Sequence, residues 1–370
     1  MGGVRDSTKD LELLSNLVLV PHPATYTATQ LTSETENLEL PVSFDLQGME
    51  DLEVLATSNH VILRAFEPLQ RMLEMVRNIE GAEWVANSIR RERARITHAL
   101  GFLQQICEAL ESGGCPVTVI KSLDHWPDLG SDLDLYTDAQ AADVIKVMGA
   151  AFGANLADRS WGDRLANKWN FIVPGLPELI EVHAGRLGQT GEQTAMTRSL
   201  AERARRIQIG DHCFKVPAAE DRIVISTLQR MYRHFYIRLC DVADNAKLLD
   251  EHAVDFEYLR SLGSTAGLWE GIATYLRIVS EYVSAYRGEG VPLPSFVSRA
   301  SRFGSNQVRY RSKFLRVPIL PHSLNLYVTE LKSLLRNGEL RNGLRLSLLP
   351  CLATAAAVEL KVTGSDKGIW

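Results

Sequence analysis

The sequence predicts an α+β protein: a short mixed β-sheet with helices packed on one side, flanked by helical N- and C-terminal lobes. Residues 117–120 form a short apolar, β-branched run, and residues 132–135 alternate acidic and apolar side chains, as strands do. Residues 83–111 instead repeat apolar side chains at helical spacing, and residues 255–370 have mainly helical patterns. The strands are therefore expected between two helical regions.

The length of 370 residues exceeds one typical hydrophobic core, so two or three lobes are expected. Apolar content of 45% and charged content of 23% are typical of a soluble globular protein, and the net charge of −5 argues against bulk binding of nucleic acid. We expect five segments: an N-terminal arm (1–43), a helical region (44–90), an α/β core (91–216), a helical lobe (217–254) and a C-terminal helical domain (255–370).

Cysteine usage and apolar runs favour a cytoplasmic protein with no membrane association. The five cysteines are scattered, and no CxxC spacing occurs, so neither a zinc site nor a disulfide framework is indicated. The N-terminus has no apolar stretch of signal-peptide length. The longest apolar run, residues 346–360, contains Pro350 and Glu359 and is too short to cross a bilayer.

The helical regions are predicted from apolar periodicity and from glycine stops. We expect a loosely ordered arm with one short helix near residues 11–20, then helices over 49–77 and 83–111, with Ser112-Gly113-Gly114 ending the second. A tail that packs on a neighbouring lobe is the alternative for the arm. Further helices are expected over the following ranges: 138–152, 197–206, 219–233, 236–249, 256–262 and 268–286.

The strand after the first helical region ends in two closely spaced carboxylates. Asp132 and Asp134 are two residues apart, so in a strand they project from one face, with Leu133 and Leu135 in the core behind them. Adjacent carboxylates repel each other and are costly to desolvate, and a bound cation removes that cost. Mg²⁺ prefers such oxygen ligands. The pattern therefore favours a metal-dependent nucleotide site; an exposed turn with solvated acids is the alternative.

Two later strands complete the predicted sheet. Residues 169–173 form one, and residues 179–183 form the other, which places Glu181 and His183 on one face and Ile180 and Val182 on the opposite face. Residues 207–209 and 212–216 are expected to pair as a small hairpin. Arg164 and Lys168 precede the strand at 169–173 and are further candidates to face phosphates.

A basic stretch with interleaved aromatic residues follows in the C-terminal part. Residues 298–316 contain six Arg or Lys side chains, no acidic residue, and the aromatic residues Phe303, Tyr310 and Phe314. Such a stretch is suited to contact nucleic acid or phosphate. A solvated surface, or a contact with the acidic body of the protein, is the alternative that we favour.

The order of these pieces resembles that of the DNA polymerase β-like nucleotidyltransferase superfamily. The motif pieces are Ile120-Lys121-Ser122, then Asp132-Leu133-Asp134-Leu135, then Glu181-Val182-His183. They look closest to a bacterial branch of uncharacterised nucleotidyltransferases, whose pattern is Leu-Lys-Gly, Asp-Ile/Leu-Asp-Leu and Asp/Glu-x-His. The resemblance covers roughly residues 93–250.

The resemblance implies the following site. Asp132, Asp134 and Glu181 would bind two Mg²⁺ (or Mn²⁺) ions, and Glu181 would also accept the proton of the attacking hydroxyl. Ser122 and neighbouring amides would hold the β- and γ-phosphates, and Lys121 would neutralise the departing pyrophosphate; a strand-end surface lysine is the alternative for Lys121.

Three further residues are nucleotide-binding candidates in the same site. Ser131 is an alternative phosphate contact. His183 is expected to position Glu181 or to touch the acceptor, with a structural histidine as the alternative. Arg238 lies on the lobe at 217–254 that would close over the nucleotide; an ion pair with Asp241, three residues further along a helix, is the alternative.

The implied activity is transfer of a nucleoside monophosphate from an NTP, such as ATP, to a hydroxyl or phosphate, with release of pyrophosphate. The acceptor is unknown; a small molecule, a protein and RNA all remain open, and stable DNA binding is not expected. The rival interpretations are a non-catalytic nucleotide sensor or partner-binding protein of this fold, an RNA-binding or toxin-neutralising protein that uses residues 298–316, and a phosphotransferase that moves the γ-phosphate.

Overall fold

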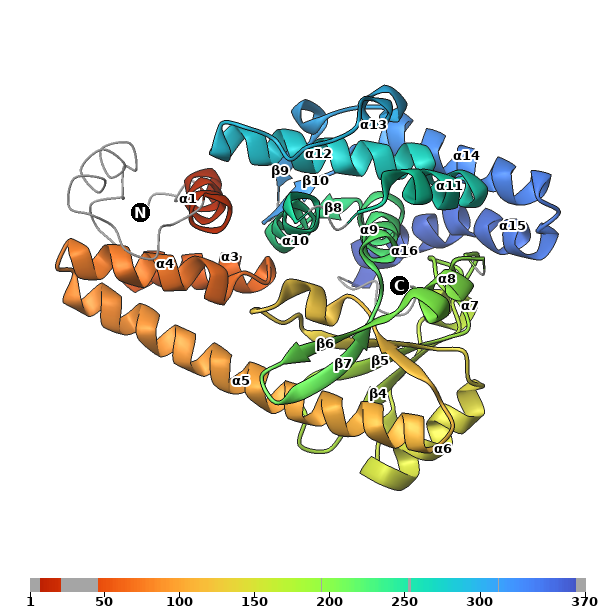
Figure 1. The fold of residues 1–370 in the computed structure, drawn as a ribbon, viewed down its shortest axis with the longest axis horizontal. Helices are drawn as coiled ribbons and strands as arrows, with labels where there is room; N and C mark the ends of the chain where they lie inside the picture. The colour runs from red at the N-terminus through yellow and green to blue at the C-terminus, as the bar shows by residue number, and fades with distance from the viewer. Residues whose placement is uncertain (1–6, 21–45, 194, 252–253, 312, 364–370) are drawn as a thin grey trace.

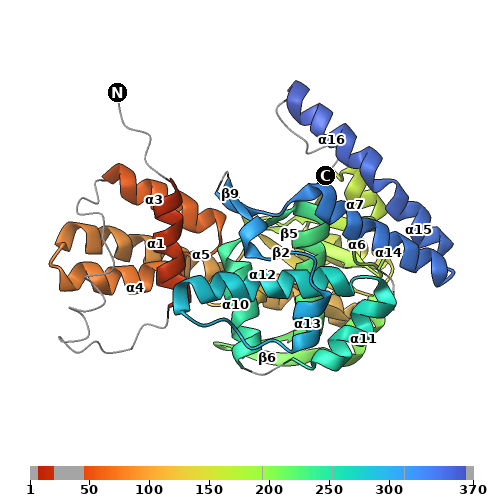
Figure 2. The same ribbon diagram turned by 90° about the horizontal axis from the view of Figure 1, so that it is seen from above.

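The computed structural model describes residues 7–20, 46–193, 195–251, 254–311 and 313–363. The protein is α+β, with a mixed sheet and flanking helices, which confirms the predicted fold class (Figure 1). The N-terminal helices gather at one end of the molecule and the last helices at the other, with the sheet between them (Figure 2).

The central sheet has five strands in the order β1-β2-β5-β4-β3. Its strands are β1 (Val117–Val119), β2 (Asp132–Thr137), β3 (Asn155–Leu156), β4 (Lys168–Ile172) and β5 (Leu179–Ala184). β2 and β5 run parallel, and the other neighbours are antiparallel. The register pairs Asp134 with Glu181, and paired side chains lie on the same face, so Asp132 and Asp134 of β2 share a face with Glu181 and His183 of β5.

Apolar side chains bury one face of β2 and β5. Leu133, Leu135, Ile180 and Val182 are all fully buried, which confirms the predicted alternation. The helix α5 (Ile79–Ser112) packs against β1 and against α6 (Ala141–Phe152). The polar face of β2 and β5 is thereby left for the cleft described below.

Helix α5 begins and ends as its sequence predicts. The Asn78 side chain accepts a hydrogen bond from the Gly81 amide at its start. Its apolar stripe is buried, with Leu103, Ile106 and Leu110 all fully covered. Gly113 caps its end, and Gly114 follows with φ of +78°, a conformation that favours glycine.

The predicted single helix over residues 49–77 is wrong, because the chain forms two helices, α3 (Leu46–Ser58) and α4 (Ile62–Met75). The break lies at Asn59 and His60, and His60 has φ of +52°. Asn59 Oδ1 accepts a hydrogen bond from the Leu239 amide, and its Nδ2 donates to the Leu55 and Lys313 carbonyls. These contacts to distant segments outweigh the local helical periodicity.

Helix α1 (Ser7–Leu19) confirms the short helix expected in the N-terminal arm. It packs against α4 and against α12 (Trp269–Arg287). Leu14 is fully buried, and the Ser15 hydroxyl hydrogen-bonds to the Tyr282 hydroxyl at 2.8 Å. The arm's helix thus joins both flanking helical regions, as the packed alternative predicts; residues 21–43 lie outside the described residues.

The remaining elements follow the predicted order, with two shifts. The helix predicted over 219–233 ends early and continues as the π-helical turn η2, and the one predicted from 236 starts later because its first residues form β8. The elements from the centre of the chain are α7 (Trp161–Leu165), α8 (Ala195–Arg203), β6 (Arg205–Ile209), β7 (His212–Val216), α9 (Ala219–Thr227), η2 (Leu228–His234), β8 (Tyr236–Ile237) and α10 (Leu239–Asp250).

The C-terminal part is mainly helical but contains a small sheet. Strands β9 (Arg309–Arg311) and β10 (Phe314–Arg316) pair with β8 in the order β8-β10-β9. Its helices are α11 (Phe256–Ala266), α12, α13 (Ser295–Ala300), α14 (Leu324–Arg336), α15 (Leu340–Ser347) and α16 (Leu349–Thr363). Among the described helices, none has the length and apolarity that a bilayer crossing requires.

Candidate active site

The polar face of β2 and β5 brings the predicted acidic residues together. Ligand-type atoms of Asp134, Glu181 and His183 all lie within 4.8 Å of one another. Asp132 projects from the same face of β2, one pleat before Asp134, and its Oδ2 accepts from the Ser131 hydroxyl at 3.3 Å. We call Asp132, Asp134 and Glu181 the carboxylate face. It lines a cleft with a volume of about 170 Å³.

Two lysines contact this face. The Lys121 ammonium forms an ion pair with Asp134 Oδ1. Lys168, a buried residue at the start of β4, lies 3.0 Å from Glu181 Oε1 and 2.9 Å from Asp163 Oδ1. Asp132 has no such ion pair in the part of the chain that the structure describes. The carboxylate face is therefore only partly neutralised by the protein's own cations.

Because Asp134 has a lysine partner and Asp132 has none among the described residues, the pKa values of the two aspartates shift in opposite directions. Burial, together with the negative charges of Glu181 and Asp134, raises the pKa of Asp132 to about 6. Burial also opposes ionisation of Asp134, but Lys121 and then His183 outweigh it and lower its pKa. Burial lowers the pKa of His183, so its ring is neutral at pH 7. Of these two aspartates, Asp132 is thus the one whose negative charge is the less favourable in the protein alone.

The Lys121-Ser122 turn has an unusual backbone. Lys121 has φ of +62° and ψ of −57°, and the Ser122 amide donates to the Ile120 carbonyl at 2.6 Å. These values describe a γ-turn with positive φ, the rarer and more strained of its two forms. The strained turn lies directly beside the carboxylate face, because the Lys121 side chain pairs with Asp134.

The Ser122 hydroxyl fixes the start of β2. It accepts from the Asp134 amide at 2.7 Å and donates to the Asp132 carbonyl at 3.2 Å. Its hydrogen atom is therefore engaged by the backbone of β2, and the side chain is buried. A direct contact of Ser122 with phosphate stays a prediction; Ser131, which is exposed, also lines the cleft.

The wall opposite the carboxylate face comes from η2, β8 and the start of α10. It is basic, and its cleft-lining residues are Arg230, Arg233, His234, Tyr236 and Arg238. The Asp241 carboxylate lies 2.6 Å from Arg230 Nε and accepts from the Arg238 backbone amide at 2.7 Å. The alternative of an Arg238–Asp241 side-chain ion pair is therefore not what the structure shows. Arg238 instead lies over the rings of Tyr236 and Phe314.

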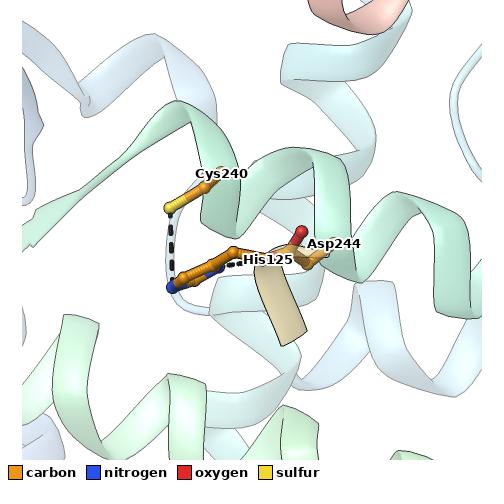
Figure 3. A group of neighbouring side chains, drawn as sticks. All are labelled: His125, Cys240 and Asp244. Atoms are coloured by element: carbon orange, nitrogen blue, oxygen red, sulfur yellow. Dashed lines mark hydrogen bonds and ion pairs between the residues drawn. The ribbon is translucent and has the colours of Figure 1, made fainter. Parts of the chain in front are cut away.

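A second group of polar side chains adjoins the cleft and is drawn in Figure 3. His125 Nδ1 lies 2.5 Å from Asp244 Oδ2, and Cys240 Sγ lies 3.9 Å from His125 Nε2. Asp244 Oδ1 accepts from Arg64 Nη1 at 2.7 Å. The spacing of the three residues is compatible with a metal site, but both oxygens of Asp244 already have protein donors. A hydrogen-bond network explains the group without an ion.

Arg64 is the centre of that network. Its Nε donates to Asp128 Oδ2 at 3.0 Å, and its Nη2 donates to the His125 carbonyl at 3.1 Å. Asp128 also accepts from the Leu63 amide at 2.7 Å. The Arg64 network, which comprises Arg64, Asp128, His125 and Asp244, therefore joins α4, the turn after β1 and α10. It fixes the N-terminal helices against the segment that leads into β2.

The sequence missed Lys168 as a partner of Glu181 and missed the Arg64 network altogether. The position of Lys168 before a strand indicated a phosphate contact, but its pairing with Glu181 depends on the β4–β5 register. The second candidate, Arg164, lies over the Trp161 ring instead, at 5.5 Å from its centroid. Arg64 lies in a periodic helix and carries no local signal of its role.

Most basic side chains of the stretch at 298–316 are exposed, and a few of its residues contact the rest of the protein. Arg302 pairs with Glu270 through two hydrogen bonds. The Phe314 ring stacks on Tyr236 with centroids 4.4 Å apart, and Arg316 lies over both rings. These contacts agree with the alternative in which the stretch meets the acidic body of the protein. Phe314 also borders a groove beside the cleft.

The fold and the carboxylate face define an α+β protein with an acidic strand pair facing a basic helical wall. Comparison with protein families gives a match over residues 54–284 to the family described as uncharacterised nucleotidyltransferase. Because the match covers more than half of the chain, the protein belongs to this family, and its general function is nucleotidyl transfer. No curated protein matches the chain. No solved structure matches it either.

Proposed function

We propose that the protein is a metal-dependent nucleotidyltransferase that moves a nucleoside monophosphate from an NTP to an acceptor hydroxyl or phosphate and releases pyrophosphate. The observation that carries this proposal is the carboxylate face: Asp132, Asp134 and Glu181 lie on one face of two adjacent parallel strands. The basic wall across the cleft supplies the charge that a triphosphate requires. The motif match to the Leu-Lys-Gly, Asp-x-Asp, Asp/Glu-x-His branch belongs to the same proposal.

The residues present fit a divalent cation. The raised pKa of Asp132 comes in part from the charges of its two neighbouring carboxylates, which a bound cation would relieve. The buried His183 Nε2 lies 3.6 Å from Asp134 Oδ1, and neither ring nitrogen has a closer hydrogen-bond partner among the described residues. We propose that Asp132, Asp134 and Glu181 hold Mg²⁺ or Mn²⁺. When bound, the metal supplies positive charge for the triphosphate and lowers the pKa of the acceptor hydroxyl.

The protein's own residues bind the nucleotide and receive the proton. Lys121, Arg233 and Arg238 bind phosphate oxygens from two sides of the cleft, with Ser122 and Ser131 at its floor. The acceptor oxygen forms a bond to the α-phosphorus while the bond from that phosphorus to the bridging oxygen breaks. Pyrophosphate leaves with that oxygen, and the acceptor's proton passes to Glu181. Lys168 holds the Glu181 carboxylate in place for this step.

The segments have different roles in this proposal. Residues 91–216 form the catalytic core, and 217–254 form the lobe that closes the nucleotide site. Residues 44–90 brace that core through Arg64. Helix α1 of the arm (1–43) and helices α11 and α12 of the C-terminal domain (255–370) pack against the lobe. The five free cysteines suit a reducing compartment, and we propose a cytoplasmic location.

Labelled nucleotides test the proposed reaction. The protein is incubated with NTPs labelled at the α- or the γ-phosphate, with Mg²⁺ or Mn²⁺ and candidate acceptors. The proposal predicts α-label in the product and γ-label in pyrophosphate. Transfer of the γ-label to the acceptor would instead establish a phosphotransferase.

A non-catalytic nucleotide sensor is the second candidate, and one observation favours it. The Lys121 ammonium occupies the side of Asp134 Oδ1, where a metal ion would otherwise lie. A sensor of this kind would bind NTP with equal affinity in the presence of Mg²⁺ and of EDTA. The catalytic proposal predicts that EDTA weakens NTP binding at least tenfold.

A further inference from the structure

A groove with a volume of about 480 Å³ lies beside the cleft. It is bounded by the end of α3, the start of α4, α5, the segments before β2 and β5, and β10. The groove and the cleft share four lining residues: His60, Gly130, Ser131 and Arg238. The two spaces therefore adjoin along these residues, and Ser131 directly precedes Asp132 of the carboxylate face.

The groove opens on one particular side of the carboxylate face. Ser131 directly precedes Asp132, and Glu178 directly precedes β5, so the groove meets the N-terminal ends of both strands. A separate hollow, lined by Lys121, His183 and Arg233, lies toward Asp134. Its two cations, Lys121 and Arg233, are among the proposed phosphate ligands. The groove approaches from the side of Asp132, one pleat before the paired Asp134 and Glu181, and the attacking group of the acceptor would enter there.

The positive and negative side chains that line the groove are equal in number. Arg95 donates to Glu92 and to Glu178, each at 2.6 Å, so this guanidinium is already neutralised. Arg238 supplies the second positive charge, and burial lowers the pKa of His60 well below its ordinary value. Two carboxylates therefore face two guanidiniums and a neutral imidazole. A surface for a polyanion such as RNA would instead carry an excess of cations.

The other lining residues make the groove largely apolar with a few polar groups. Its apolar residues are Ile62, Leu129, Pro177 and Phe314. Glu178 is only 5% exposed, and its Oε2 has no hydrogen-bond partner among the described residues. The buried Nε of Arg238 likewise has none. A buried acceptor and a buried donor without partners indicate a ligand that satisfies both.

We propose that this groove binds the acceptor, and that the acceptor is a small organic molecule with an apolar body, a hydroxyl that reaches the carboxylate face, and a hydrogen-bond donor that meets Glu178. A concave, largely apolar site of this size with few polar groups is typical of small-molecule recognition. The inference rests on the proposed nucleotidyl transfer. The acceptor hydroxyl attacks the α-phosphorus, its proton passes to Glu181, and pyrophosphate leaves.

The test uses α-labelled NTPs and a cell extract divided by ultrafiltration. The full-length protein is incubated with Mg²⁺, the labelled NTPs and either the small-molecule filtrate or the retentate that contains protein and RNA. The expected result is a labelled product from the filtrate. Thr57→Trp, which fills the groove from an exposed position on α3, and Glu178→Gln are each expected to reduce that product at least tenfold with unchanged NTP affinity.

Asp51→Trp is the matched control, because Asp51 is exposed on the same helix and does not line the groove. It is expected to retain the wild-type yield. Label found only in protein or RNA would overturn the inference, as would a filtrate product that Thr57→Trp and Glu178→Gln leave unchanged. If the wild-type protein binds NTP but labels nothing in either fraction, the proposed function itself fails.

Discussion

Two clusters of buried charge lie next to each other in this protein, and they differ in how well their carboxylates are satisfied. In the Arg64 network, each oxygen of Asp128 and of Asp244 accepts at least one hydrogen bond from a protein donor. In the carboxylate face, the Ser131 hydroxyl is the one hydrogen-bond donor to Asp132 among the described residues, and burial and the neighbouring carboxylates raise the pKa of Asp132.

This difference indicates that the Arg64 network stabilises the fold, whereas the carboxylate face is suited to bind a ligand. Buried charges that are fully hydrogen-bonded fix the positions of the elements they join. Neighbouring like charges that lack hydrogen-bond or ion-pair partners destabilise the fold. Binding of a cation or a charged substrate removes that destabilisation. The Arg64 network therefore braces the site, and we propose that the carboxylate face performs the chemistry.

Among the variants proposed here, Asp132→Asn is expected to have the largest effect, which is on the rate of nucleotidyl transfer. It removes one proposed metal ligand, so the rate of transfer falls by about 10²–10³-fold. The folded-state pKa of Asp132 is raised to about 6, so its ionised form destabilises the fold at pH 7, and the neutral asparagine removes that cost. Thermal unfolding followed by circular dichroism should show a melting temperature at or above that of the wild-type protein. A large drop would make Asp132 a structural residue.

Arg64→Met, unlike Asp132→Asn, is expected to destabilise the fold strongly. It leaves the carboxylates of Asp128 and Asp244 buried without their main cation, which costs about 3–5 kcal/mol of unfolding free energy. Urea denaturation measures this loss. The matched control is Arg91→Met, because the Arg91–Glu53 pair is exposed and is worth less than about 1 kcal/mol. Equal losses in the two variants would remove the distinction between the clusters.

Metal affinity should depend on pH through Asp132. Because its pKa lies near 6, this carboxyl is neutral below that pH and must lose a proton to bind a cation. Mn²⁺ affinity, measured by calorimetry, should fall up to tenfold for each pH unit below about 6 and level off above it. The same titration of Asp132→Asn should lack this step. Retention of the step in the variant would assign it to another group.

The strained turn gives the smallest expected effect. Lys121→Ala and Lys121→Gly both remove the charge beside Asp134, but only glycine adopts φ of +62° without strain. The glycine variant should therefore be more stable than the alanine variant by about 1 kcal/mol in urea denaturation. Equal stabilities would show that the turn relaxes when the lysine is removed.

Local patterns predicted the elements that form the site. β2 and β5 follow from alternation at residues 132–135 and 179–183, and α5 follows from its apolar stripe and its glycine stop. The shared face of Asp132 and Asp134 needed only the two-residue period of a strand. The sequence alone did not show that Glu181 lies opposite Asp134, because that depends on the parallel register of β2 and β5.

What the sequence did not predict depends on contacts between distant residues. The break between α3 and α4 comes from Asn59, whose side chain bonds to Leu239 and Lys313. Arg64 meets Asp244 across 180 residues of chain. The pairing of Lys168 with Glu181 likewise requires two antiparallel strands to be in register. Periodicity within a window of residues contains no information on such pairs.

Pyrophosphate release by the wild-type protein and by the Asp132→Ala, Glu181→Ala double variant tests the central claim most directly. The assay uses NTP, Mg²⁺ and the small-molecule filtrate, with thermal unfolding recorded on the same samples. The wild-type protein is expected to release one pyrophosphate for each nucleotide transferred, and the double variant is expected to release none while it still unfolds cooperatively. A folded double variant that retains the wild-type rate would contradict the assignment of nucleotidyl transfer to the carboxylate face.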